Sequence, residues 1–184
     1  DDLYAKGEKA KEFNFGSLAA SMEGKFRSGH FNGMATIVEK FFNIINPTKA
    51  FFGQKDLQQL QIVKALVKQM HSDIEIIGIP IIRDESGLAK SSRNSLLSAN
   101  AKTEALLISK CLNFCTDNKR LGISELQKYI KSAFEKSRNL ELEYAEFVSL
   151  KQMKEIKEWE AENQSAVCIA AYIDGVRLID NIIL

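Results

Sequence analysis

Residues 49–82 read "KAFFGQKDLQQLQIVKALVKQMHSDIEIIGIPII", a stretch in which the spacing of apolar residues changes twice. Lys49–Gly53 is a short apolar run, which is typical of a buried strand. From Asp56 onward, apolar residues recur every three or four positions, as they do in a helix with one buried face. Residues 74–82 form a nearly continuous run rich in β-branched side chains, which predicts a strand buried on both faces. Strand, helix and strand in this order predict one parallel βαβ unit with a right-handed connection.

A loop and a helix precede this unit. Residues 26–34, "FRSGHFNGM", place two glycines around His30, and apolar residues then recur at helical spacing until Pro47. This pattern predicts a loop that leads into a buried helix. Residues 16–24 indicate a shorter helix that ends at Gly24. His30 has two interpretations, a ligand contact or a residue that stabilises the loop by hydrogen bonding to backbone, and we favour the structural role.

The βαβ unit is followed by a polar segment and two helices. Residues 83–95, "RDESGLAKSSRNS", are rich in turn formers and indicate a hinge between two domains. Helical spacing then predicts helices over residues 99–114 and 124–137. Ser124 and Gln127 form a capping-box signature at the start of the second helix.

The last third of the chain predicts an antiparallel sheet. Apolar and acidic residues alternate over residues 140–144, which indicates a strand with one solvated face. Residues 151–162 are a charged segment, and we interpret its acidic part, residues 155–162, as a solvated helix face with Trp159 as its apolar anchor. Residues 166–184, "AVCIAAYIDGVRLIDNIIL", indicate two strands joined at a turn around Asp174 and Gly175. Helices together with such a sheet predict a small α+β domain.

Composition excludes several classes of protein. Hydrophobic residues make up 45% and charged residues 27% of the chain, which is ordinary globular composition. The formal net charge is +1, which argues against a nucleic-acid binder or an anionic-membrane binder. No apolar run is long enough for a membrane helix. Three cysteines, Cys111, Cys115 and Cys168, favour a reducing compartment, and we expect a cytoplasmic protein. Cys111 and Cys115 are four residues apart, and buried packing is favoured over metal binding because neither histidine is near them in the sequence.

Two clusters carry residues that suit anions. At the junction of the first predicted strand and its helix, Gly53 permits close approach, Lys55 supplies charge, and Asp56 caps the helix or contacts magnesium. Residues 90–93 place two hydroxyls between two cations. Each cluster is also compatible with ordinary capping and a solvated surface, and no Walker-type glycine loop is present. Because both follow strands of one parallel unit, we expect them at the same edge of the sheet.

Four motifs together resemble the pantoate-beta-alanine ligase family. They are "RSGHFNGM", "FFGQKDLQQLQIV", "IEIIGIPIIRDESGLAKSSRNSLLS" and the terminal "VRLIDN", and their order fits along the whole chain. The resemblance implies a partial Rossmann-like nucleotidyltransferase βαβ unit in residues 1–82 and a C-terminal α+β lid domain in residues 83–184. It also implies that ATP and pantoate form pantoyl adenylate and pyrophosphate, after which beta-alanine displaces AMP.

The resemblance assigns roles to particular residues. Lys55, Ser91, Ser92 and Arg93 are implied to be catalytic. ATP contacts are implied for Gly53, Gln54, Lys55, Asp56, Ile82, Lys90, Ser91, Ser92 and Arg93. Gln59 is implied to bind pantoate, and Asp56 is implied to lie near magnesium when ATP is bound. The family resemblance also implies a homodimer for the full-length protein, with no nucleic-acid or membrane partner.

Several departures from the family pattern stand out. Ser28 replaces a usual proline, Gln54 a usual glutamate, and Lys90 a usual methionine or leucine. The family's first strand–helix unit, with its HxGH signature, has no counterpart in these residues. We therefore expect the later part of a longer protein that does not catalyse the full reaction alone. Two other classes stay open, namely a non-catalytic interaction module that keeps the fold and another adenylate-forming nucleotidyltransferase.

Overall fold

The computed structural model describes residues 11–159 and 164–184 and divides into two compact units, Asp1–Ile79 and Pro80–Leu184. The expected domain boundary is at residue 82, a few residues after this division. Each unit is described by itself below. Among the described residues, none of the helices combines the length and the apolar character that a membrane crossing requires.

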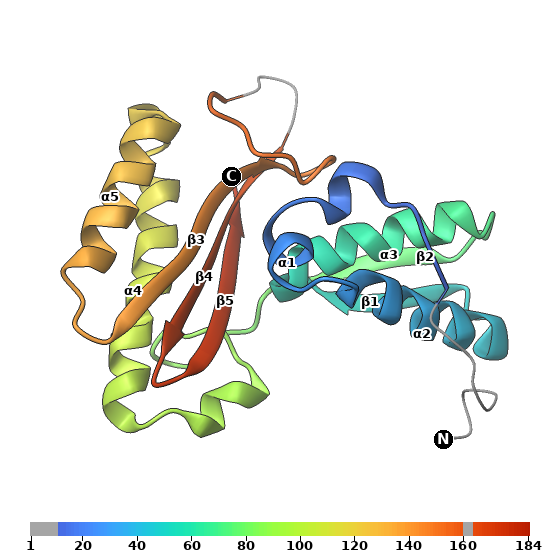
Figure 1. Ribbon diagram of the computed structural model, residues 1–184, viewed down its shortest axis with the longest axis horizontal. Coiled ribbons are helices and arrows are strands. Elements are labelled where there is room, and N and C mark those ends of the chain that lie inside the picture. Colours follow the sequence, from blue (N-terminus) through green and yellow to red (C-terminus); the bar gives the residue numbers. More distant parts are fainter. Residues whose placement is uncertain (1–10, 160–163) are drawn as a thin grey trace. The chain divides into compact units, whose positions relative to one another are not determined.

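The first unit contains the expected parallel βαβ unit. Its elements are η1 (Gly16–Ala19), α1 (Met22–Phe26), α2 (His30–Ile45), β1 (Lys49–Gly53), η2 (Gln54–Asp56), α3 (Leu57–Gln69) and β2 (Glu75–Ile79). β1 and β2 pair in parallel with Phe51 opposite Ile77, so the strand–helix–strand prediction is confirmed (Figure 1). The short helix predicted over residues 16–24 is instead two pieces, and Gly24 lies inside the second piece.

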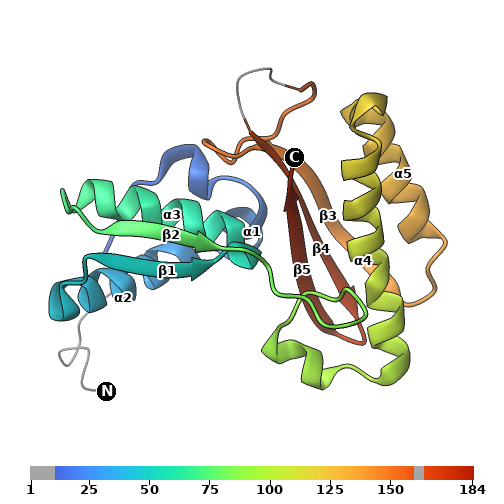
Figure 2. The same cartoon turned by 180° about the vertical axis from the view of Figure 1, so that it is seen from behind.

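One face of the β1–β2 sheet is covered and the other is open to solvent. Ala50, Phe52 and Ile76 pack against a cluster that α2 and α3 supply, and Figure 2 shows both helices behind the two strands. On the opposite face Phe51 is 63% exposed and Ile79 is 38% exposed. The prediction that residues 74–82 are buried on both faces is therefore wrong, because both helices pack on the same side of the sheet. The prediction that β1 is a buried strand is wrong for the same reason. β2 also ends at Ile79 rather than at residue 82.

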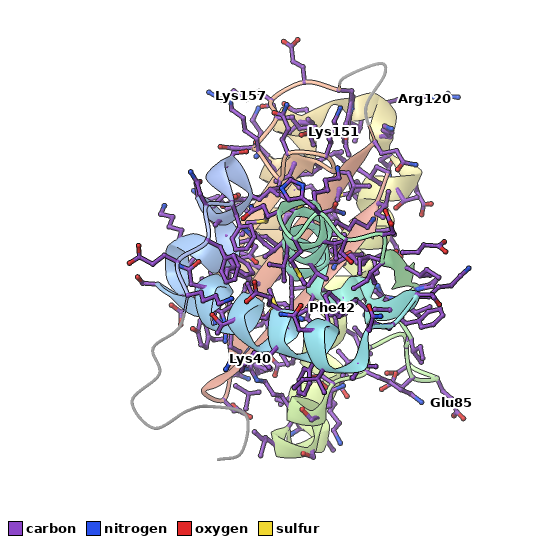
Figure 3. The ribbon with its side chains drawn as sticks, turned by 90° about the vertical axis from the view of Figure 1, so that its right-hand side faces the viewer. Lys40, Phe42, Glu85, Arg120, Lys151 and Lys157 are labelled. Carbon is purple, nitrogen blue, oxygen red and sulfur yellow. The ribbon has the colours of Figure 1, made fainter. Side chains whose placement is uncertain are left out.

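Helix α2 is likewise only partly buried. Phe31, Ala35 and Phe42 are buried in the core of the first unit. Four further apolar residues on its other side, Ile37, Phe41, Ile44 and Ile45, are exposed. The prediction of a buried helix thus holds for one face of α2. In Figure 3, Phe42 lies on this helix, whereas charged side chains such as Glu85, Arg120 and Lys157 project away from the ribbon.

The second unit is a three-stranded antiparallel sheet with two long helices. Its elements are η3 (Ser92–Leu96), α4 (Ala99–Asp117), η4 (Lys119–Leu121), α5 (Ile123–Glu135), β3 (Leu140–Ser149), β4 (Ser165–Ile173) and β5 (Val176–Ile183). The strand order is β3-β4-β5, with β4 in the centre. Asp174 and Gly175 both have positive φ, 50° and 74°, which suits a tight hairpin turn between β4 and β5. The predicted α+β architecture is confirmed.

The core of the second unit lies between the sheet and the two helices (Figure 1). Ile108 and Leu112 on α4, Leu126 on α5 and Ile169 on β4 are almost completely buried. Cys111 and Cys115 are buried in the same cluster with free thiols, as the packing interpretation predicts. Burial raises the pKa of Cys111 to about 11 and that of Cys115 to about 12.

Two local predictions for the second unit are wrong. Helix α5 begins after Gly122 and has no side-chain cap, so the capping box of Ser124 and Gln127 does not form. Residues 151–159 contain no helix, because the chain turns back and pairs with the end of β3 through a bridge between Val148 and Glu155. Residues 160–162 of that predicted helix lie outside the described residues.

Trp159 does serve as an anchor for this returning segment. Its indole N–H donates to the Lys119 carbonyl oxygen at 3.0 Å, and its ring packs edge-on against Phe147. The apolar role predicted for this side chain is therefore retained without the helix.

Candidate functional site

The first candidate cluster lies at the carboxyl end of β1. Gly53 has φ −67° and ψ 130°, an extended conformation that any residue adopts. A Cβ atom at this position would meet no other atom within 4 Å, so the backbone of the strand end is open to approach. β2 ends beside it, since Gly53 is opposite Ile79 in the register. The cluster therefore occupies the kind of sheet edge at which α/β proteins bind ligands.

η2 and the first turn of α3 carry the polar residues of this cluster. Gln54, Lys55 and Asp56 form the 3-10 turn that leads into α3. Asp56 occupies the N-cap position of α3 but makes no side-chain capping bond. The capping interpretation of Asp56 is thus wrong, and its side chain is exposed.

Two adjacent glutamines on α3 have different surroundings. The Gln58 side chain is buried, and its amide nitrogen donates to the carbonyl oxygens of Leu18 and Ser21 at 2.8 and 2.9 Å. Its amide oxygen accepts from the Glu23 backbone N–H. Gln58 therefore ties the segment before α2 to α3. Gln59 is half-buried and has no such structural bonds among the described residues, so its amide is available to a ligand.

His30 belongs to the surroundings of Asp56. Its Nε2 lies 3.0 Å from the Arg27 guanidinium, and its ring contacts Phe31. Burial and, secondarily, the Arg27 charge lower the pKa of His30, while the Glu23 and Asp56 carboxylates oppose that shift. The side-chain partner of His30 is thus Arg27, at the end of α1, rather than backbone.

The second candidate cluster lies in the second unit, after β2. The Lys90 N–H donates to the Ile82 carbonyl oxygen at 2.9 Å, so the chain folds back on itself between these residues. The Ser91 hydroxyl accepts from the Arg93 N–H and caps η3, and the Arg93 guanidinium donates to the Arg177 carbonyl oxygen at 3.3 Å. Lys90 and Ser92 are exposed, and their side chains make no hydrogen bond or ion pair with the described residues.

Sequence reasoning missed a partly buried ion pair next to this cluster. Arg83 donates to both oxygens of Asp180 on β5, at 2.6 and 3.0 Å. The sequence signal was an aspartate inside the apolar run "VRLIDNII" of β5. Such a residue is seldom buried without a cationic partner.

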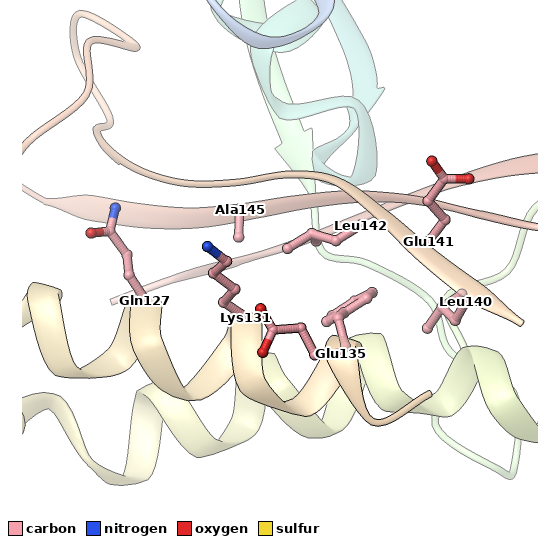
Figure 4. A pocket seen from close by; sticks show the side chains of 8 residues that line it. Gln127, Lys131, Glu135, Leu140, Glu141, Leu142 and Ala145 are labelled. Atoms are coloured by element: carbon pink, nitrogen blue, oxygen red, sulfur yellow. The ribbon is translucent and has the colours of Figure 1, made fainter. Parts of the chain in front are cut away.

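A separate cavity of about 480 Å³ lies between α5 and β3 (Figure 4). The apolar residues that line it include Phe134, Leu140, Leu142 and Ala145. The polar residues that line it include Gln127, Lys131 and Glu135. None of the residues assigned by resemblance lines it. This cavity therefore does not belong to either candidate cluster.

Comparison with known proteins identifies the family. The family model described as pantoate-beta-alanine ligase matches residues 1–183. The chain belongs to this family. The pantothenate synthetase of Phocaeicola vulgatus is 44% identical over 184 residues, which cover 99% of this chain and 65% of that protein. The chain thus spans 65% of the length of this relative.

Solved structures of pantothenate synthetases have the same fold. The enzyme of Thermus thermophilus matches with a TM-score of 0.90 at 30% identity, covering 98% of this chain and 66% of that chain. The pantoate-beta-alanine ligase of Francisella tularensis, solved with beta-gamma ATP and beta-alanine, matches with a TM-score of 0.64 at 33% identity. That match covers 90% of this chain and 54% of the Francisella chain. The mixed fold of a nucleotidyltransferase-like unit and a C-terminal unit is therefore established.

Proposed function

We propose that the whole protein condenses pantoate with beta-alanine at the expense of ATP, and that the 184 residues alone do not complete this reaction. The observation that carries the proposal is the match of residues 1–183 to the ligase family. The Francisella tularensis relative solved with beta-gamma ATP and beta-alanine supports the same substrates. The 65% coverage of the Phocaeicola vulgatus enzyme supports the expected inactivity of the chain by itself.

The proposed reaction has two steps. A carboxylate oxygen of pantoate attacks the α-phosphorus of ATP, the bond to pyrophosphate breaks, and pantoyl adenylate forms. The amine nitrogen of beta-alanine then attacks the acyl carbon, AMP leaves, and the amine proton passes to water or phosphate. The first step brings two anions together. Positioning and charge neutralisation therefore supply most of the lowering of its barrier.

In the proposal the first cluster binds both partners of that step. Gly53 and Gln54 contact ATP through the open strand end, and Lys55 neutralises phosphate oxygens. Gln59 orients pantoate through its side-chain amide, which can donate to a carboxylate or hydroxyl. The open end of β1 and the half-buried position of Gln59 support these assignments.

In the proposal the second cluster covers the nucleotide. The backbone of Ile82 lines the adenine, while Lys90, Ser91, Ser92 and Arg93 contact phosphates. The side chains of Lys90 and Ser92 are exposed and form no hydrogen bond or ion pair with the described part of the chain, which supports this role. Ser91 caps η3 and Arg93 contacts β5, so each already has one fixed bond that orients it.

Magnesium fits the first cluster only together with phosphate oxygens. Among the described residues no group of three His, Cys, Asp or Glu side chains could hold a metal ion. Magnesium in nucleotide sites is commonly held by one or two carboxylates plus phosphates, and the exposed Asp56 carboxylate meets that requirement. Asp56 would hold the ion, which would neutralise charge on the phosphates.

The proposal also includes a homodimer of the full-length protein in the cytoplasm, with no nucleic-acid or membrane partner. The exposed apolar side of α2, formed by Ile37, Phe41, Ile44 and Ile45, supports self-association. The three buried cysteines form no disulfide, which suits a reducing compartment. Sedimentation of the chain and of its Ile44→Glu variant measures self-association through α2. If both proteins sediment as monomers, the result counts against the dimer.

A chimera tests the proposed reaction. Residues 1–184 replace the matching 184 residues of the Phocaeicola vulgatus enzyme, which supplies the rest of the family's length. We expect the chimera to release pyrophosphate when ATP and pantoate are present and to form pantothenate once beta-alanine is added. The 184-residue chain assayed in parallel should form none.

Two outcomes contradict the proposal. Turnover by the isolated chain overturns the expected inactivity. A folded chimera that releases no pyrophosphate overturns the ligase assignment and favours a non-catalytic module. The role of Gln59 is supported if a Gln59→Ala chimera still binds ATP but no longer releases pyrophosphate when pantoate is added.

A further inference from the structure

Residues 82–94 form a closed loop held by its own hydrogen bonds. The Lys90 N–H donates to the Ile82 carbonyl oxygen, and the Asp84 N–H donates to the Leu88 carbonyl oxygen, both at 2.9 Å. The Asp84 carboxylate accepts from the backbone N–H groups of Ser86 and Leu88 at 2.9 and 3.0 Å. This network fixes the shape of the loop. These bonds join residues of the loop to one another and do not attach the loop to the rest of its unit.

The Arg83 guanidinium provides that attachment. One nitrogen, Nη1, donates to the Gly87 carbonyl oxygen at 3.1 Å and to Asp180 at 2.6 Å, while Nη2 donates to the other Asp180 oxygen at 3.0 Å. Asp180 lies on β5, 97 residues further along the chain, and is 5% exposed. A single planar group therefore joins the turn of the loop to the sheet in two directions, a geometry that the lysine ammonium does not reproduce.

A second contact holds the other end of the loop on the same strand. The Arg93 guanidinium donates to the Arg177 carbonyl oxygen, and Arg177 lies three residues before Asp180 on β5. The side chains of Lys90 and Ser92, between the two attachment points, make no bond with the described residues. The loop is thus fixed at its ends and presents unpaired polar groups between them.

We infer that Arg83 and Asp180 are positioning residues whose ion pair holds the 82–94 loop on β5 and so places Lys90 and Ser92 for phosphate oxygens. The role of Lys90 and Ser92 rests on the proposed function, whereas the attachment itself does not. Fixed donors bind an anion more tightly than mobile ones, because no ordering is needed when the anion arrives. Arg83 and Asp180 would not touch the nucleotide.

Hydrogen exchange of the 184-residue chain tests the attachment. Asp180→Asn and Arg83→Met should each accelerate exchange of the amides of Asp84, Gly87, Leu88 and Lys90 by about tenfold or more, since each leaves one partner of a buried charged pair. Arg83→Lys should give an intermediate acceleration because it keeps the charge but not the double contact. The helices α4 and α5 should exchange as before.

Glu143→Gln is the matched control. Glu143 forms an ion pair with the side chain of Arg177 on the same sheet, whereas Arg93 of the 82–94 loop binds the backbone carbonyl of Arg177, which the substitution keeps. This variant should leave exchange in the loop unchanged. Unchanged loop exchange in Asp180→Asn overturns the inference, as does an acceleration spread evenly over the second unit, which would mean that the pair only stabilises the fold.

Calorimetric titration with ATP and magnesium separates the inference from the proposed function. If the unaltered chain binds ATP, Asp180→Asn should weaken binding about tenfold and Glu143→Gln should not. A loosened loop with unchanged ATP affinity supports the attachment and overturns the phosphate role of residues 90–93. If the unaltered chain binds no ATP, the result counts against an autonomous nucleotide site, and the exchange data alone decide on the attachment.

Discussion

β2 and β4 consist of similar residues but have different surroundings. β2 reads "EIIGI" and β4 reads "SAVCIAAYI". Every residue of β4 except Tyr172 is buried, whereas no residue of β2 is. β4 is paired on both sides, by β3 and β5, and its sheet is covered by α4 and α5. β2 pairs only with β1 among the described residues, and helices cover one face. Apolar composition allows a strand to be buried, but its neighbours determine whether it is.

The largest stability effect is expected in the centre of the second unit. Ile169 on β4 is completely buried, so Ile169→Ala should lower the free energy of unfolding of that unit by about 2–5 kcal/mol. Ile169→Val, which removes one methyl group, should cost about 1 kcal/mol. Trp159, the single tryptophan, packs in this unit, so its fluorescence during urea unfolding measures both variants. Equal effects of the two variants would contradict a close-packed β4.

In the first unit, the largest effect is expected on the reaction rather than on stability. Lys55→Ala in the chimera should reduce pantothenate formation about 10²–10³-fold, because a preorganised charge on the phosphates is lost. Its unfolding free energy should change by less than about 1 kcal/mol. Lys68→Ala, at an exposed position on α3, is the control and should leave the rate unchanged. A similar rate loss in both variants would point to a general charge effect.

Stability at alkaline pH is expected to depend on Cys111 and Cys115 in the second unit. Their folded-state pKa values, about 11 and about 12, lie above the usual value of 9.0. The unfolded chain therefore ionises first, so the contribution of the buried thiols is complete below pH 9 and decreases as pH rises toward 11–12. At pH 10, ionisation of the two thiols in the unfolded chain should lower the free energy of unfolding by roughly 2–3 kcal/mol relative to pH 7.

The double variant Cys111→Ala/Cys115→Ala isolates this effect. Urea unfolding at pH 7 and pH 10, with a reducing agent present, should show a smaller pH dependence in the variant. The lysines and tyrosines titrate in both proteins, so only the difference between the two pH dependences is informative. Identical pH dependences would mean that the thiols ionise equally in the folded and unfolded chains.

The features that the sequence predicted correctly depend on near neighbours in the chain. β1, the turn at Asp174 and Gly175, and the helical periods of α3 and α4 all follow from spacing over a few residues. The candidate residues of the site came from motif resemblance, and their local roles could be argued from charge and hydrogen-bonding capacity. Roles that require substrates stay predictions.

Most of the features that were missed depend on distant residues, and the capping box is the exception. The Ser124 capping box was predicted from local spacing, but η4 and Gly122 start α5 one residue earlier. Residues 155–159 have a charged pattern that predicts a helix, yet the pairing of Glu155 with Val148 of β3 takes precedence. Arg83 and Asp180 are 97 residues apart, and no local pattern indicates that they meet. The half-exposed β2 was missed because periodicity does not report how many faces of a sheet are covered.

The smallest effect is expected for Phe51, on the open face of β1. Its ring is 63% exposed, so Phe51→Ala should change the unfolding free energy of the first unit by no more than about 0.5 kcal/mol. Phe52 is the matched control, because it is the next residue of the same strand and its ring packs edge-on against Phe42. Phe52→Ala should cost about 2 kcal/mol, since a half-buried ring loses part of the 3–5 kcal/mol of a fully buried one. Hydrogen exchange at residues 62–67 of α3 measures both. If Phe51→Ala is as costly as Phe52→Ala, the open face of the sheet is packed in solution against another surface, and β2 would then be buried on both faces as its sequence predicts.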